Sequence, residues 1–304
     1  MLNRQLDSLS AFNPDVVIGD VRSSMARPIS KWAEARKVLH LIPRNPNKAL
    51  VEKKRYTFLT HPSFQMHGSQ LALHMYHAQN MRRFVVFNDQ TTVSNWFAKA
   101  FISAVDSLPG VTIVEKTIAQ EYEYNRKTIP QYVRSLKGSG YDAIYVPLSS
   151  EEAAGLIISQ LNYHKVEIPV LGGPDWEIFN VIDPELKTRY DLQYSAFYYD
   201  QNDSIIYDSL YTTCLRDYSY QPSKYTVQGY DIMAYVLNLT SSELGAGDLG
   251  IAARQAPVFH GIHQDFEFGE GQINKKINII KFQDGRITKV NWDSEEPDPF
   301  RDGE

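Results

Sequence analysis

Residues 15–24 have the sequence DVVIGDVRSS, in which a short apolar run ends abruptly in a polar turn that contains a glycine. The same arrangement recurs at 84–90 (FVVFNDQ), 144–150 (IYVPLSS) and 170–176 (VLGGPDW). Short apolar runs that alternate with amphipathic segments indicate βαβ units around a parallel sheet buried on both faces. Ligands of such sheets bind beyond the carboxyl ends of the strands, so a functional site is expected at these four turns.

Composition narrows the class of protein. The 304 residues allow two domains at roughly 150 residues each. The net charge of -5 offers no electrostatic basis for binding nucleic acid or an anionic membrane surface. No apolar run approaches the ~18 residues of a membrane-spanning helix, and residues 1–7 lack a signal-peptide core. Cys214 is the only cysteine, which excludes an internal disulfide, and we expect it to be buried packing.

The periodicity of apolar residues predicts the elements between the turns. Helices are predicted at 25–35, 65–79, 93–108, 129–137, 151–163, 204–218 and 224–239, with a short one from 176. Strands are predicted at 16–18, 38–41, 84–87, 111–114, 143–146, 170–171 and 194–197, with an extended segment at 56–60. Alternation of period two at 266–268, 277–282 and 287–290 predicts strands joined by hairpin turns at 269–271 and 283–286. The acidic residues 292–304 are predicted to be a disordered tail.

In this order, seven blocks of the sequence resemble the type I periplasmic binding proteins, in particular the branched-chain amino acid type solute-binding components of ABC transporters and their receptor-domain relatives. The blocks are 15–24, 56–72 (YTFLTHPSFQMHGSQLA), 88–101 (NDQTTVSNWFAKAF), 141–160 (YDAIYVPLSSEEAAGLIISQ), 170–176, 221–237 (QPSKYTVQGYDIMAYVL) and 259–287. No single block is specific. The resemblance rests on the seven blocks occurring in the family's order and together spanning nearly all of residues 15–290.

The resemblance implies an α/β fold of two doubly wound, Rossmann-like lobes of parallel sheet. A three-strand hinge would join the lobes, with a ligand cleft between them that closes on binding. Lobe one would comprise 1–60 and 198–265, and lobe two 61–197 and 266–291.

The chain departs from the family at its start. The family has a strand, a helix and a second strand before the block that matches 15–24, whereas about a dozen residues stand there in this chain. Residues 2–12 are interpreted as the end of a helix. We therefore expect the first strands of lobe one to be missing, so that the chain is a fragment or that another chain completes the sheet edge, for example in a dimer.

In lobe one, the resemblance places Ser23 and Ser24 at the turn that holds a ligand carboxylate, with helix capping as the alternative role. The hydroxyl groups of the family's second turn are replaced by IPRNPN at 42–47. Arg44 and Asn45 offer other donors there, and arginine suits bidentate binding of an anion.

In lobe two, a cleft tyrosine of the family falls on Val93. Ser149 and Ser150 follow one strand, as ligand contacts or as helix caps. Asp175 matches the family's acidic position, which neutralises a ligand amine, and Trp176 beside it is able to stack on a ring or a cation. The alternative is a capping aspartate and a packed tryptophan.

No metal or cofactor is predicted. His74 and His77 are three residues apart, as are His260 and His263, but no carboxylate or cysteine nearby completes a metal site. Phosphate-binding loops, nucleophile elbows and catalytic carboxylate pairs are not recognisable, so an enzyme is not expected.

The leading hypothesis is a solute-binding or sensor protein that closes on a small polar ligand, amino-acid-like or another metabolite, for ABC-type uptake or sensing. By resemblance it would be periplasmic or otherwise exported, with a membrane permease or receptor as partner. The alternative is a scaffold or interaction protein that keeps the fold with a degenerate ligand site. The effector domain of a transcription regulator and a sugar-nucleotide transferase are further hypotheses, without a DNA-binding motif or an active site in the sequence to support them.

Overall fold

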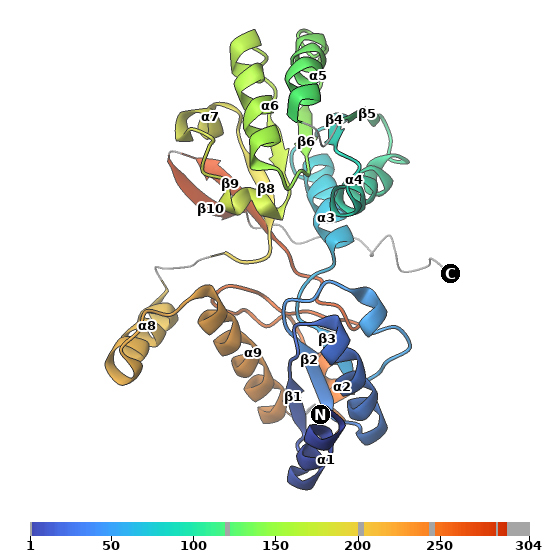
Figure 1. The fold of residues 1–304 in the computed structure, drawn as a ribbon, viewed down its shortest axis with the longest axis vertical. Helices are drawn as coiled ribbons and strands as arrows, with labels where there is room; N and C mark the ends of the chain where they lie inside the picture. Colours follow the sequence, from blue (N-terminus) through green and yellow to red (C-terminus); the bar gives the residue numbers. More distant parts are fainter. Residues whose placement is uncertain (1, 119–121, 200–203, 243–246, 284, 291–304) are drawn as a thin grey trace. The chain divides into compact units, whose positions relative to one another are not determined.

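The structure, a computed structural model, describes residues 2–118, 122–199, 204–242, 247–283 and 285–290. It divides into two compact units, of which unit one comprises Met1–Ser63 and Phe197–Lys276, and unit two Phe64–Ala196 and Ile277–Glu304. The chain passes three times from one unit to the other, and each unit combines helices with parallel strands (Figure 1). The predicted α/β class with two parallel-sheet lobes is confirmed. The predicted tail at 292–304 lies outside the described residues.

Unit one is built on a small parallel sheet. Among the described residues its strands are β1 (Val16–Ile18), β2 (Leu39–Ile42) and β3 (Thr57–Leu59), in the order β1-β2-β3. The helical segments are α1 (Leu2–Phe12), α2 (Ser23–Arg36), the 3-10 helix η1 (Lys48–Leu50), α8 (Ile205–Tyr218), α9 (Lys224–Ser241) and α10 (Leu249–Gln255).

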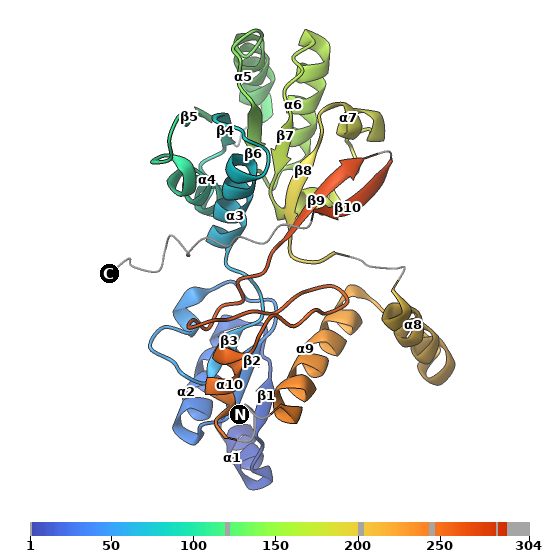
Figure 2. The same ribbon diagram turned by 180° about the vertical axis from the view of Figure 1, so that it is seen from behind.

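Both faces of this sheet are covered. Leu39 and Leu41 of β2 pack with side chains of α9 and α10 on one face, where Tyr235 and Phe58 complete the core. Figure 2 shows these two helices beside the sheet. Ile42 contributes to a separate cluster with α2 and η1. All four residues of β2 are buried, as expected of a strand inside a parallel sheet.

Unit two has a larger, mixed sheet. Within the described residues it has seven strands in the order β10-β9-β8-β7-β6-β4-β5. The strands are β4 (Arg83–Asn88), β5 (Thr112–Thr117), β6 (Ala143–Val146), β7 (Val170–Gly172), β8 (Gln193–Ala196), β9 (Asn278–Gln283) and β10 (Arg286–Val290). The pairings from β5 through β8 are parallel, and β9 and β10 are antiparallel to their neighbours. The helical segments are α3 (Phe64–His77), α4 (Thr92–Val105), α5 (Tyr122–Ser135), α6 (Glu151–His164), the 3-10 helix η2 (Pro174–Ile178) and α7 (Pro184–Arg189).

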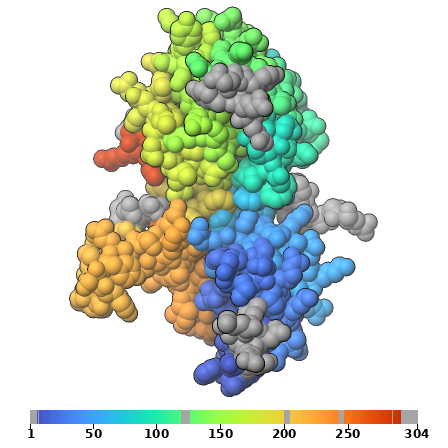
Figure 3. All heavy atoms as spheres, viewed as in Figure 1, coloured from blue at the N-terminus to red at the C-terminus, as the bar shows by residue number. Residues whose placement is uncertain are grey.

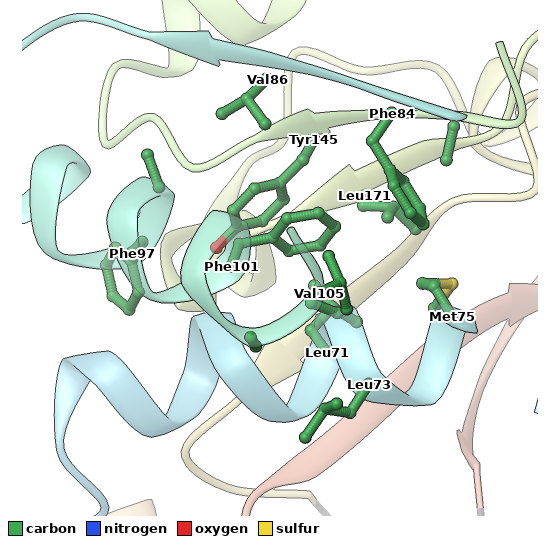
Figure 4. Close-up of a cluster of buried hydrophobic side chains, with 14 of the residues drawn as sticks. Leu71, Leu73, Met75, Phe84, Val86, Phe97, Phe101, Val105, Tyr145 and Leu171 are labelled. Atoms are coloured by element: carbon green, nitrogen blue, oxygen red, sulfur yellow. The ribbon is translucent and has the colours of Figure 1, made fainter. Parts of the chain in front are cut away.

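The core of unit two forms where α3 and α4 cover the sheet (Figure 4). The rings of Phe101 on α4 and Tyr145 on β6 stack with their centroids 4.3 Å apart, and Phe84 meets Phe101 edge-on at 5.3 Å. Gly68 allows α3 to approach α4, because a Cβ there would lie 2.3 Å from the Phe97 carbonyl oxygen.

Cys214 of α8, in unit one, is buried, as expected from the sequence.

Residues 266–276 belong to unit one, which corrects the predicted boundary of lobe two at 266. Phe266 and Phe268 pack in the core beside Phe58 rather than in a ladder. The Leu59 N–H donates to the Gln272 carbonyl at 2.8 Å, so the following segment runs alongside β3. The expected hairpin at 269–271 is therefore a loop of unit one, whereas β9 and β10 pair antiparallel as predicted.

Among the described helices, none combines the length and the apolar character needed to cross a membrane. Three short helical segments, η1, α7 and α10, have no counterpart among the predicted elements.

The contact between α3 and α4 yields a stability prediction. Gly68→Ala should lower the free energy of unfolding by about 1–3 kcal/mol, because the added methyl group forces the two helices apart. Gly229→Ala on α9 is the matched control, since no atom lies within 4 Å of the added Cβ, and it should stabilise by up to ~1 kcal/mol. Urea denaturation measures both, and a stable Gly68→Ala variant would contradict the packing described.

Candidate functional site

The carboxyl ends of β1 and β2 bring two turns of unit one together. The Asn45 side-chain amide donates to the Val21 carbonyl at 2.8 Å and to the Ser23 hydroxyl at 3.0 Å. Its oxygen accepts from the Asn47 N–H at 3.0 Å. Asn45 is 4% exposed. The structure thus joins Ser23 and Asn45, and the role it gives Asn45 is to hold the two turns in place.

The start of α2 has hydrogen-bond donors that the protein does not use. The N-cap residue is Arg22, whose side chain makes no capping bond, so the expected capping by Ser23 or Ser24 is wrong. Arg22 is instead paired with Asp20 at 2.9 Å, which lowers the pKa of the Asp20 carboxyl through hydrogen bonds from Arg22. Within the described residues, neither the Ser23 nor the Ser24 N–H has an acceptor. Free N–H groups and the helix dipole favour an anion at such a position.

Arg44 lies at the same edge, after β2. It is exposed, and its backbone has a left-handed φ of 54°. Its guanidinium lies 4.2 Å from the ring centroid of Tyr225, at the start of α9. Among the described residues, no carboxylate pairs with Arg44. The aromatic ring holds the guanidinium in place while leaving its N–H groups available to an anion. The sequence reasoning missed Tyr225, because the contact joins residues far apart in the chain.

His61, which follows β3, was also missed. It is 6% exposed, and its ring lies 3.9 Å from that of Phe197 and 5.8 Å from that of Tyr198. Burial, with a smaller contribution from the charge of Arg44, lowers the pKa of His61 to about 3. The side chain is therefore a neutral, aromatic part of this edge at neutral pH. The only sequence signal was its place directly after an apolar strand.

In unit two, the turn after β4 is fully engaged within the protein. The Asn88 amide donates to Asn95 at 2.9 Å and to Glu115 at 2.7 Å, while its oxygen accepts from the Gln90 N–H and the Ser94 hydroxyl. These bonds leave the Asn88 side chain with little capacity for a ligand. Trp96, one turn along α4, is 41% exposed and stacks on Phe64, and the sequence reasoning did not select it.

The four residues predicted at the turns after β6 and β7 have different roles in the structure. Ser150 caps α6 by accepting from the Ala153 N–H at 3.2 Å, so its capping alternative is confirmed. Ser149 is exposed, and Asp175 is half-buried with no hydrogen-bond partner in the described part of the chain.

Trp176 is 2% exposed and donates its indole N–H to the Val146 carbonyl at 2.9 Å. Its ring packs on Gly172, where a Cβ would lie 2.5 Å from the ring. The packing alternative therefore describes Trp176, which forms part of the frame of the turn.

The described residues contain no group of three or more His, Cys, Asp or Glu side chains arranged to hold a metal ion. His74 of α3 is 3% exposed, and burial lowers its pKa to about 4.

Comparison with solved structures shows the fold. The chain is similar to an ABC transporter substrate-binding protein from Desulfitobacterium hafniense in complex with leucine, at 20% identity and a TM-score of 0.62, over 95% of this chain and 85% of that one. It is also similar to a putative branched-chain amino acid ABC transporter protein from Rhodospirillum rubrum, at 14% identity and a TM-score of 0.69, over 95% and 93%.

A third similar structure is an ABC transporter solute-binding protein from R. palustris in complex with benzoate, at 17% identity and a TM-score of 0.55, over 95% and 80%. No protein-family model and no curated protein sequence matches the chain. These neighbours are binding proteins, and the chain has the two-lobed fold of the type I periplasmic binding proteins that the sequence resembles.

The buried histidines yield a pH prediction. Because the folded pKa values of His61 and His74 lie below the ordinary 6.5, their contribution to stability is present above pH 6.5 and is lost as the pH falls towards 4 and 3. The free energy of unfolding should fall by up to about 1.4 kcal/mol per pH unit for each histidine. Urea denaturation over this range measures the slope.

His61→Phe should reduce that slope, whatever its effect on absolute stability, because it removes one buried titrating group. His77→Gln, on the exposed side of α3, is the control and should keep the parent slope. An unchanged slope in His61→Phe would contradict the assignment.

Proposed function

We propose that the chain is a solute-binding protein that takes a small polar ligand with an anionic group at the carboxyl edge of the unit-one sheet. The observation that carries this proposal is the set of unused donors at that edge. The N–H groups of Ser23 and Ser24 have no acceptor in the described residues, and Arg44 has no carboxylate partner. Leucine and benzoate, which two of the structural neighbours bind, both carry a carboxylate.

The residues of unit one would have two roles, to bind the anionic group and to position the residues that bind it. Arg44 and the N–H groups of Ser23 and Ser24 bind the anionic group, with the Ser24 hydroxyl exposed beside them. Asn45 positions Ser23 and Arg44 by holding their turns together. In unit two, Ser149 and Asp175 stay the residues predicted from the sequence as ligand contacts, with Asp175 taking a cationic group if the ligand has one. Ser150 and Trp176 support that turn from within the fold.

The setting of the proposed function is ABC-type uptake or sensing, with export from the cytoplasm and a membrane permease or receptor as partner. The similarity to ABC transporter binding proteins supports this setting. A dimer is the further proposal for unit one. Its support is that β1 is an edge strand of the sheet with Ile18 45% exposed, and open edges invite pairing.

A ligand panel tests the proposed function. Leucine, benzoate and other amino acids and carboxylates are titrated into the chain by calorimetry, with thermal shift as a second readout. Arg44→Gln should weaken binding of a hit roughly tenfold to hundredfold, because a hydrogen bond to a charged group contributes about 1.5–3 kcal/mol. Asp175→Asn should weaken the binding only of ligands that carry an ammonium group.

Arg36→Gln is the matched control. Arg36 also lies over an aromatic ring, that of Trp32 at 5.1 Å, but at the opposite end of α2. Its substitution should leave affinity unchanged. If no member of the panel binds, the scaffold alternative gains support. If a ligand binds equally well to Arg44→Gln, the site is elsewhere.

A further inference from the structure

A groove on unit two is lined by none of the residues assigned to ligand binding. It has a volume of about 620 Å³ and is open to solvent. Its lining comes from one side of α6 and the loop after η2, namely Glu152, Gly155, Leu156, Ser159 and Val181. Side chains of α6 lie at the surface in Figure 3, in yellow-green. We call this feature the α6 groove.

The groove is held open by its own residues. A Cβ at Gly155 would lie 3.0 Å from a methyl group of Val181, so the glycine makes room for the loop. The Glu151 carboxylate accepts from the N–H groups of Asn180 and, at 2.9 Å, of Val181. These bonds tie the loop to the start of α6, which fixes the shape of the groove before any partner arrives.

The loop after η2 has both buried and exposed apolar side chains. Phe179 and Ile182 are buried and anchor the loop, whereas Ile178 and Val181 are each 61% exposed. Leu156 is half-buried in the wall of the groove. Two large apolar side chains exposed on a pinned loop, beside a groove that Leu156 lines, are typical of a contact surface.

The segment that builds the groove has a net negative charge. Residues 149–189, from the turn before α6 to the end of α7, contain seven carboxylates, two lysines and one arginine, a net charge of -4. Glu152 stands in the groove itself and is exposed. The nearby Lys187 ammonium is engaged with the Phe179 carbonyl at 3.2 Å. The groove therefore places the apolar side chains of Leu156 and Val181 beside the carboxylate of Glu152.

We propose that the α6 groove docks a basic amphipathic segment of another protein. An apolar side chain of that segment would pack against Leu156 and Val181, and its lysines or arginines would face Glu152 and complement the net negative charge of residues 149–189. A second copy of the chain fits less well, because a symmetric contact would bring the acidic surface against itself. An anionic lipid surface is repelled for the same reason. The proposal does not depend on solute binding.

The experiment uses the full chain and two synthetic helical peptides of one design, one built from leucine and lysine and the other from leucine and glutamate. Fluorescence anisotropy measures binding at low and at physiological salt. The Leu/Lys peptide should bind at least about tenfold more tightly than the Leu/Glu peptide, with affinity that falls as salt rises. Val181→Ser and Glu152→Lys should each weaken it about tenfold.

Two control variants separate docking in the groove from general attraction to an acidic protein. Tyr163→Ser removes another exposed apolar side chain of α6, and Glu52→Lys makes the same charge change on unit one. Both should keep the parent affinity. Equal binding of the two peptides, absence of binding, or equal weakening by Glu52→Lys and Glu152→Lys would overturn the proposal. So would a concentration-dependent dimer that Val181→Ser abolishes, since the occupant would then be a second copy.

Discussion

Parallel pairing of strands is the constraint on which both units depend. In a parallel sheet every strand-to-helix turn lies at the same edge, so turns that are distant in sequence become neighbours. In unit one, β1, β2 and β3 are all parallel, and their ends bring Ser23, Asn45 and His61 to one edge. In unit two, the parallel run from β5 to β8 does the same for the turns that contain Asn88, Ser149 and Asp175.

The turns at these edges have to end strands and begin helices, and this requirement takes up many of their polar groups. The Asn88 side chain accepts a hydrogen bond from Ser94 of α4, and the Ser150 hydroxyl accepts one from Ala153 of α6. The Trp176 indole N–H donates to the carbonyl of Val146 in β6. What is left for a ligand is what the fold does not use. At the start of α2 the N–H groups of Ser23 and Ser24 have no acceptor in the described residues, and Arg44 at the same edge has no carboxylate partner there. The combination of these donors supports the proposal that unit one anchors the ligand.

The sequence was sufficient for elements whose pattern is local. The apolar runs at 16–18 and 143–146 gave strands with those bounds. In β6 the reason is burial on both faces, which requires continuous apolar residues, whereas β1 is an edge strand and only partly buried. The alternation at 266–268 was misleading, because it does not mark a strand of a sheet: Phe266 forms an isolated antiparallel bridge with Phe259. The rings are buried by packing in the core, Phe268 on Phe58 and Phe266 on Tyr235. The partnership of Arg44 with Tyr225 depends on tertiary contact, which no local pattern encodes.

The segments that leave unit one are held by polar bonds deep in the protein. The Thr60 carbonyl accepts from the side-chain amides of Gln264 at 2.8 Å and Asn274 at 3.1 Å. Asp231, which is 1% exposed, accepts from three successive N–H groups that end at Gln264. Breaking such a buried bond leaves a polar group unpaired at a cost of about 1–3 kcal/mol. Bending of the chain within this network is therefore disfavoured. The turns that carry Ser23 and Asn45 are tied to each other separately, through the Asn45 side-chain amide.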